Sequence, residues 1–403
     1  MTSNTRVVVI GAGLAGVRLA RRLGELGVPA LVIGEEEHRP YNRVLLAEVL
    51  AGRYSPDVIA LPAPAELTRA RVTGIDRAGR SVECADGSKI AYDTLVLATG
   101  SNPVLPPLRG LFTPDHVLPE GVHAFRTMDD CLGLSKAVRP GVRAVVIGGG
   151  LLGVSAARAL ALRGAQVVLA QQSERLMERQ LDPAASKLVR RHLTDLGVEI
   201  HTECRVRDVR CVGGAVRSVE MADGYALDAD LVVLACGVHP RVGLAQIAGL
   251  DVRKGVVVDD ELRTSDPHIR AIGDCAQHDG TVYGLATPAL EQADALAESL
   301  AGDADARYTG TRSLTRLTLT GQSAFDLAAF GETEALPGDD VVQLADATRG
   351  TYRKVVVRDD RLVGGVLVGE LGTVGALARA WEGAEPLPDD GPLLHLLTND
   401  GGS

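Results

Sequence analysis

The sequence is poor in aromatic residues and in positive charge. Aromatic residues make up 3% of its 403 residues, with one Trp, and 52 acidic residues outnumber 42 Lys and Arg, which gives a net charge of −10. So few aromatic rings disfavour a platform on which bases stack, and the negative charge disfavours a protein that neutralises nucleic-acid phosphates. We therefore expect no nucleic-acid partner.

Long apolar runs and cysteine motifs are also missing. The most apolar stretch, 144–170, is interrupted by Arg158, Arg163 and several glycines, so it does not predict a membrane span. The six cysteines contain no CxxC pair and no zinc-like spacing. A β-branched run begins at residue 6, which leaves no room for a secretory signal peptide. We expect a cytoplasmic protein with no membrane partner and no metal site.

Glycine, by contrast, is abundant, and some of its 46 residues follow a pattern. Residues 6–10 (RVVVI) predict a buried strand, and a second strand at 30–33 leads to Glu35. Between them, three glycines open an Ala- and Leu-rich helix: Gly11, Gly13 and Gly16. In such a unit the glycines allow a tight turn, the approach of a pyrophosphate and close helix packing, and an acid accepts ribose hydroxyls. The pattern predicts a dinucleotide site.

The same pattern occurs a second time. A strand at 143–147 precedes another glycine motif, and a strand at 165–170 leads to Gln171. The second motif consists of Gly148, Gly150 and Gly153. Each unit is closed by a similar buried strand, one ending at Thr99 and Gly100 and the other at Gly237. The two copies are too far apart for a solenoid repeat, so they predict two separate nucleotide-binding domains.

The remaining chain predicts one further ligand contact and a third domain. A strand delivers Asp274 at its carboxyl end, where ligands bind in such sheets, and a helix from 288 to 300 follows. Beyond residue 312 the pattern changes to strands at 314–319, 351–357 and 362–368 and a helix at 374–381. We predict an α/β fold with two Rossmann-like dinucleotide-binding domains plus a small C-terminal α+β domain.

These features resemble the two-dinucleotide-binding flavoprotein reductases, the pyridine nucleotide–disulfide oxidoreductase superfamily. Segments 39–46, 176–182 and 283–288 are similar to the flavin-reductase portion of assimilatory NAD(P)H nitrite reductases, with rubredoxin and ferredoxin reductases as near relatives. The resemblance implies four parts: a discontinuous FAD domain (1–112 and 238–312), an NAD(P) domain (113–237), a C-terminal α+β domain (313–385) and a tail (386–403).

The resemblance also implies the cofactors FAD and NAD(P)H and the residues that hold them. The FAD contacts would be Gly11, Gly13, Gly16, Glu35, Arg43, Thr99, Gly100, Asp274 and Thr287. The NAD(P) contacts would be Gly148, Gly150, Gly153, Gln171 and Gly237. Asp274 would bond the ribityl chain, and Thr287, at the start of the 288 helix, would favour the negative charge of reduced flavin.

One window and two positions depart from the family pattern. The window 41–48 contains no Cys, which disfavours disulfide-reductase activity. Relatives carry a Lys where this chain has Glu48 and a Glu where it has Ser155. Glu48 and Ser155, together with Thr287, are candidates for residues close to the flavin. No side chain needs to transfer a proton in the hydride step. In the second unit, neutral Gln171 can bond a ribose hydroxyl without repelling a phosphate, and Arg175 could meet a 2′-phosphate. We expect the protein to use NADH, or both NADH and NADPH.

Three functions are compatible with this pattern. The first is an FAD-dependent oxidoreductase that passes electrons from NAD(P)H to a separate redox partner, either a ferredoxin- or rubredoxin-like carrier or a nitrate or nitrite reductase component. The second is an FAD-dependent oxidase, dehydrogenase or lyase-like enzyme acting on a small organic substrate with weakened nicotinamide use. The third is a non-enzymatic flavin-bound scaffold or sensor. A homodimer is one possible assembly.

Overall fold

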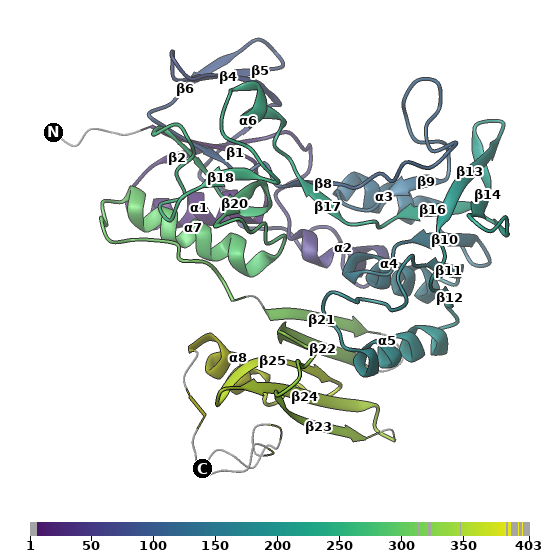
Figure 1. Cartoon of the computed structure of the whole chain (residues 1–403). Helices are drawn as coiled ribbons and strands as arrows, with labels where there is room; N and C mark the ends of the chain where they lie inside the picture. Colours follow the sequence, from purple (N-terminus) through teal and green to yellow (C-terminus); the bar gives the residue numbers. More distant parts are fainter. Residues whose placement is uncertain are drawn as a thin grey trace.

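Two five-stranded parallel sheets form the centre of the molecule (Figure 1). The computed structural model describes residues 6–312, 314–320, 324–346, 348–383, 386, 387, 394 and 397. The first sheet, in the order β19-β7-β1-β2-β3, consists of β1 (Val7–Ile10), β2 (Ala30–Gly34), β3 (Glu66–Arg69), β7 (Thr94–Leu97) and β19 (Ile269–Ala271). The second, in the order β12-β11-β10-β16-β9, consists of β9 (Val122–Ala124), β10 (Arg143–Ile147), β11 (Gln166–Ala170), β12 (Glu199–His201) and β16 (Leu231–Leu234). The predicted pair of Rossmann-like units is confirmed.

The two sheets share one register at their centres. Ile10 pairs with Ile33 across β1 and β2, and Ile147 pairs with Ala170 across β10 and β11. The last residues of β1 and β10 are therefore equivalent, and the glycine turns that follow leave the same edge of each sheet. All residues of β1 are buried, as expected for a β-branched strand in a sheet covered on both faces.

Helices cover both sheets. In the first unit α1 (Leu14–Glu25) packs against α7 (Ala286–Leu300), and the second unit carries α3 (Met128–Ala137), α4 (Leu151–Leu162) and α5 (Pro183–Asp195). Helix α7 begins two residues before the predicted start at Pro288. Pro288 fits there because the first turn of a helix needs no backbone N–H donor. No helix in the described part of the chain is long and apolar enough to cross a bilayer.

A short helix of the first unit packs on the second unit. The turn η1 (Arg43–Leu45) leads into α2 (Leu46–Leu50), which contacts α3 and α4. Leu46 and Leu50 belong to the same buried cluster as Val146 and Leu160 of the second unit. Helix α2 therefore joins the two units through a shared apolar core.

Smaller elements surround the two parallel sheets. Two antiparallel sheets, which the sequence reading did not predict, consist of β4 (Val72–Asp76), β5 (Ser81–Cys84) and β6 (Lys89–Ala91), and of β13 (Val206–Val212), β14 (Ala215–Met221) and β15 (Ala226–Asp228). The chain crosses between the units on the paired strands β8 (Ser101–Pro103) and β17 (Val238–Pro240). The remaining elements are α6 (Gly243–Ile247), β18 (Val256–Val258), η2 (Gly273–Cys275) and β20 (Ala276–His278).

The C-terminal domain is an antiparallel sheet with one helix. In the order β21-β22-β25-β24-β23, its strands are β21 (Leu314–Thr320), β22 (Ala324–Gly331), β23 (Asp340–Asp346), β24 (Thr351–Arg358) and β25 (Arg361–Val368), followed by α8 (Val374–Gly383). Strands β22 and β23 were not predicted. The sheet lies beside α5 (Figure 1), where the ring of His192 stacks on Phe325 at 4.6 Å. Most of the predicted tail, 386–403, lies outside the described residues, although Leu397 is buried in the same apolar cluster as Trp381.

Candidate dinucleotide sites

The chain leaves β1 and β10 through the same sharp turn. Gly11 has φ of +120° and Gly148 has φ of +109°, a region that residues with a Cβ rarely adopt. A Cβ at Gly11 would lie 2.1 Å from the carbonyl oxygen of Ala98, and one at Gly148 would lie 2.4 Å from that of Ala235. Each turn therefore requires glycine.

The other glycines of each motif differ in their surroundings. A Cβ at Gly16 would lie 2.0 Å from the carbonyl oxygen of the turn glycine, and one at Gly153 would lie 1.8 Å from its counterpart. By contrast, Gly13 and Gly150 have no atom within 4 Å of an added Cβ, and both are helix N-caps without a side-chain hydrogen bond. The open space thus faces free backbone N–H groups, which attract phosphate. Both turns fit the pyrophosphate of a dinucleotide.

The position that follows the second strand differs between the units. Two residues beyond Ile33 stands Glu35, and two residues beyond the equivalent Ala170 stands Gln172. The Glu35 carboxylate accepts hydrogen bonds from both terminal nitrogens of Arg241, one of them at 2.9 Å. The Arg241 guanidinium lowers the pKa of Glu35, which keeps the carboxylate ionised. The register thus makes the exposed Gln172 the counterpart of Glu35.

Gln171 lies against the glycine turn. Its Oε1 accepts a hydrogen bond from the Gly149 backbone N–H at 2.7 Å, and its Nε2 donates to the Arg175 carbonyl at 3.4 Å. The spacing from the first glycine predicts Gln171 as the counterpart of Glu35. The strand register, which the sequence alone does not give, makes Gln172 the counterpart instead. Gln171 therefore supports the turn with both ends of its amide.

Asp274 lies in η2, beyond the end of β19, in a charged cluster. One oxygen of its carboxylate accepts from Ser101 Oγ at 2.7 Å and from Arg126 at 2.7 Å. Arg126 also donates to Ser101 Oγ at 2.6 Å. The following thiol, Cys275, is fully buried. Two distant parts of the chain thus fix the carboxylate that the resemblance assigns to the ribityl chain.

Arg43 belongs to a neighbouring group of polar side chains. Its guanidinium pairs with Glu36, donates to the Tyr41 hydroxyl at 2.7 Å and donates to the Arg126 carbonyl at 3.2 Å. The Tyr41 hydroxyl donates to Glu36 at 2.7 Å and accepts from the Met128 N–H at 2.8 Å. Burial raises the pKa of Tyr41, so it stays protonated. Arg43 thus contacts Arg126, the residue whose side chain binds Asp274.

The predicted residues after the closing strands meet at the crossover between the units. Thr99 Oγ1 donates to the Arg241 carbonyl at 2.7 Å, and the Gly100 carbonyl accepts from the Arg241 N–H at 2.9 Å. On the other strand the Gly237 carbonyl accepts from the Val104 N–H at 2.9 Å. Gly100 and Gly237 both have positive φ. The same Arg241 therefore connects this crossover to Glu35.

Glu48 forms an ion pair that spans the two units. Its carboxylate binds Arg158 of α4 and lies 3.7 Å from Arg53. The Arg158 side chain is 1% exposed and that of Glu48 is 14% exposed. Burial lowers the pKa of Arg158, an effect that Glu48 opposes. Sequence reasoning missed Arg158, although a single charged residue between Ala157 and Ala159 in an otherwise apolar helix was a usable signal.

The other two flavin-proximal candidates take simpler positions. Ser155 is buried and its Oγ donates to the Leu151 carbonyl at 2.8 Å, within its own helix. Thr287 is exposed in the first turn of α7. The Ser155 hydroxyl is therefore bonded within α4.

The cysteines do not supply a reactive thiolate. No disulfide occurs among the described residues, and all six cysteines are free. Burial raises the pKa of Cys131 and of Cys236 to about 11, and it also raises the pKa of Cys275. Because the thiolate is the reactive form, these residues stay inert near neutral pH.

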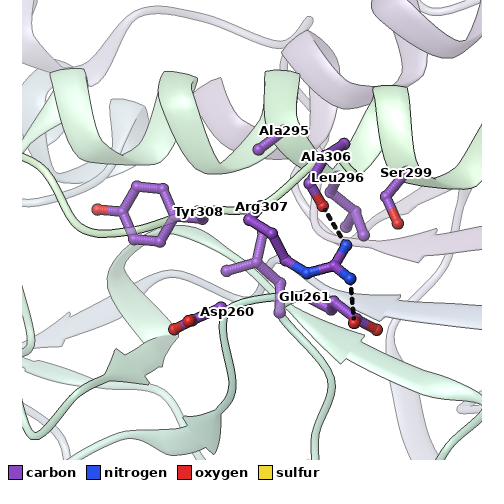
Figure 2. A pocket seen from close by; sticks show the side chains of 9 residues that line it. Asp260, Glu261, Ala295, Leu296, Ser299, Ala306, Arg307 and Tyr308 are labelled. Carbon is purple, nitrogen blue, oxygen red and sulfur yellow. Dashed lines mark hydrogen bonds and ion pairs between the residues drawn. The ribbon is translucent and has the colours of Figure 1, made fainter. Parts of the chain in front are cut away.

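A pocket on the first unit lies away from both glycine turns. It is lined by Asp260, Glu261, Leu262, Ala295, Leu296, Ser299, Ala306, Arg307 and Tyr308. Figure 2 shows Arg307 across it, bonded to Glu261 and to the Ala306 carbonyl, both at 2.9 Å. No residue of either glycine motif lines this pocket, so it is not the dinucleotide site.

Two Rossmann-like units, each with a glycine turn that fits a pyrophosphate, define a dinucleotide-dependent oxidoreductase fold. The chain belongs to the pyridine nucleotide-disulphide oxidoreductase family, whose sequence profile matches residues 5–293. Residues 315–382 match the C-terminal domain of rubredoxin NAD+ reductase. These matches confirm the predicted class, an FAD-dependent NAD(P)H oxidoreductase, and its resemblance to nitrite and rubredoxin reductases.

Individual relatives extend over most of the chain. It is 34% identical over 378 residues to the assimilatory nitrate reductase electron transfer subunit of Bacillus subtilis, covering 91% of this chain and 48% of that protein. It is 31% identical to the "Probable ferredoxin reductase CtmF" of Castellaniella defragrans, covering 90% of each. The reductase in the covalent putidaredoxin reductase–putidaredoxin complex superimposes with a TM-score of 0.86 at 26% identity, covering 98% of this chain and 99% of that one. The chain thus spans about half the length of the nitrate reductase relative.

Proposed function

We propose that this protein is an FAD-dependent reductase that takes electrons from NAD(P)H and passes them to a separate redox protein, either a ferredoxin- or rubredoxin-like carrier or a nitrate or nitrite reductase component. The observation that carries the proposal is the pair of equivalent cradles. Gly13 and Gly150 each face open space at a helix N-terminus, on sheets that α2 joins. A relative covered over 90% of its length is named a ferredoxin reductase, which supports a protein acceptor.

The residues of the first unit suit a resident flavin. We assign the FAD pyrophosphate to the turn at Gly11 and Gly13, the adenosine ribose to Glu35 and the ribityl chain to Asp274. Bound at these residues, FAD would supply the redox chemistry that links a nicotinamide donor to the acceptor. Because Arg241 and Arg126 already fix the two carboxylates, the acceptor groups for the hydroxyls are oriented before the cofactor binds.

The residues of the second unit suit the nicotinamide substrate. Here Gly148, Gly150 and Gly153 form the turn, Gln171 supports it, and we assign the adenosine ribose to Gln172. The amide can bond a hydroxyl and does not repel a phosphate. Burial raises the pKa of Cys131, Cys236 and Cys275, which disfavours thiolate chemistry at these three residues.

Anaerobic mixing tests the proposal directly. NADH or NADPH should bleach the flavin absorbance of the purified holoenzyme, and an oxidised [2Fe–2S] ferredoxin or rubredoxin should restore it. Bleaching followed by no electron transfer to any protein acceptor would contradict the acceptor class. Failure of both nicotinamides to bleach the flavin would contradict the whole proposal.

A second function follows from Ser155 and Glu48. Because the Ser155 hydroxyl is used within its helix and Glu48 pairs with Arg158, the residues that relatives place here are replaced by a different arrangement. If nicotinamide use is weakened, the flavin would serve an oxidase, dehydrogenase or lyase-like reaction on a small organic substrate. A flavin that an organic substrate bleaches and NADH does not would favour this alternative. A cytoplasmic location and a homodimer stay predictions.

A further inference from the structure

The segment after β11 folds back over the second glycine turn. Gln171 accepts from the Gly149 N–H at 2.7 Å, and the Met177 N–H donates to the Gly149 carbonyl at 2.9 Å. Leu176 is buried, and its side chain would lie 2.6 Å from a Cβ at Gly149. Both ends of the segment are thus fixed against the turn, and Arg175 lies between them, three residues after Gln172.

The Arg175 guanidinium is held by the C-terminal domain. Its terminal nitrogen lies 2.9 Å from Oε1 of Glu334, which lies between β22 and β23. The Arg175 side chain is 20% exposed and that of Glu334 is 61% exposed. The Arg175 Nε is buried without a hydrogen-bond partner in the described part of the chain. The cation nearest to Gln172 in the segment is therefore already neutralised by a carboxylate from another domain.

A buried polar cluster fixes the loop that carries Glu334. Asp182, the N-cap of α5, accepts from the Tyr352 hydroxyl at 2.5 Å and pairs with Lys354 at 3.2 Å. Lys354 also donates to the Thr333 carbonyl at 2.8 Å, next to Glu334. The loop is thus anchored to the second unit through α5, the helix beside the C-terminal sheet in Figure 1. The backbone next to Glu334 is therefore held at the domain interface.

We propose that Glu334 makes the protein selective for NADH. A 2′-phosphate at the assigned ribose position would need Arg175, but it would meet a carboxylate already bound there. The phosphate would have to displace Glu334 or lie beside a like charge, and either reduces its affinity, whereas NADH carries no such group. Specificity thus comes from a repulsive element supplied by the C-terminal domain. This inference rests on the proposed function.

The test compares two ligands that differ only in the 2′-phosphate: 5′-AMP and adenosine 2′,5′-bisphosphate. Calorimetry on the FAD-bound protein should show that Glu334→Gln raises the affinity for the bisphosphate by about 5- to 10-fold. The affinity for 5′-AMP should change by less than about 2-fold. The KM for NADPH should fall by the same factor at unchanged kcat. Glu334→Asp, which keeps the charge, should behave like the wild type.

Two further variants separate a specific effect from a general one. Glu332→Gln removes the same charge two residues away, where the partner is Arg358 at 2.7 Å, and it should change neither ligand. Adding Arg175→Ala to Glu334→Gln should abolish the gain. If Glu334→Gln leaves the ratio of the two affinities unchanged, the inference is wrong although the proposed function stands. If 5′-AMP does not bind and NADH does not bleach the flavin, both fail.

Discussion

The two dinucleotide units share one backbone and differ in the charges around it. In each unit the first glycine has positive φ. A Cβ added at the third glycine would meet a carbonyl oxygen, whereas one added at the second would face open space. Beyond the second strand, however, Glu35 stands in one unit and Gln172 in the other. The repeated backbone accounts for where a pyrophosphate fits, and it does not distinguish one dinucleotide from another.

The charged partners at these positions come from distant parts of the chain. Glu35 is bound by Arg241, on the chain that returns from the second unit, and Arg175 is bound by Glu334 of the C-terminal domain. We infer that the common fold places both nucleotides and that neighbouring segments set which nucleotide each unit prefers.

The largest expected effect concerns the ion pair between the units. Glu48→Leu should lower the free energy of unfolding by about 3–5 kcal/mol, because it removes a carboxylate partner of an arginine whose side chain is 1% exposed. Urea denaturation followed by fluorescence or circular dichroism measures this. The double variant Glu48→Leu/Arg158→Leu should recover most of the loss. A cost below about 1 kcal/mol for the single variant would contradict a structural role for the pair.

The glycine motifs give the next largest effect and separate fold from ligand. Gly16→Ala and Gly153→Ala should each cost about 3 kcal/mol or more of stability, since the new Cβ meets a backbone carbonyl at 2.0 or 1.8 Å. By contrast, Gly13→Ala and Gly150→Ala should leave stability nearly unchanged, because their added Cβ meets nothing within 4 Å.

The same variants distinguish the two units by their ligands. Gly13→Ala should yield protein that has lost flavin, whereas Gly150→Ala should keep its flavin and lose bleaching by NADH. Flavin absorbance after gel filtration and anaerobic titration read out the two effects. Identical flavin loss in both variants would contradict the assignment of FAD to the first unit.

The parallel sheets were predictable because their signals are local. Each glycine motif follows a β-branched run and opens an Ala- and Leu-rich helix, so a short window suffices. The antiparallel sheets were not predictable in this way. Strands β6 and β23 contain no buried residue, so neither presents the buried apolar positions that mark a strand in the sequence.

Positions in the candidate site were predictable only where they follow from chain order, and their roles stay predictions. Asp274 at the end of a strand is such a case. The pairs Glu48 with Arg158 and Arg175 with Glu334 join distant parts of the chain, so no local pattern indicates them. Likewise, the equivalence of Gln172 with Glu35 depends on strand register, and a shift of one residue moves a side chain to the other face.

A carboxylate at position 172 should make the second unit resemble the first, which has Glu35 at the equivalent position. Gln172→Glu should raise the KM for NADPH by about tenfold and change that for NADH by less than about 2-fold, because a carboxylate repels the 2′-phosphate. Steady-state kinetics with both nucleotides measure this. Gln171→Ala is the control, since loss of its contact with Gly149 should weaken both nucleotides equally. An equal effect of Gln172→Glu on both would contradict its assignment to the ribose.

The smallest expected effect is a pH dependence in the second unit. Burial lowers the pKa of His192, as does nearby Arg158, and burial also lowers that of His123, so the folded protein keeps both rings neutral. The unfolded chain binds more protons below about pH 6.5, so this stability is complete above that pH and declines as the pH falls. His192→Phe keeps a ring against Phe325 and removes one titrating group. Between pH 7.5 and 5.5 the variant should lose less stability than the wild type. The difference between the two losses should be below about 1 kcal/mol. Equal losses, or a steeper decline in the variant, would contradict a neutral buried His192.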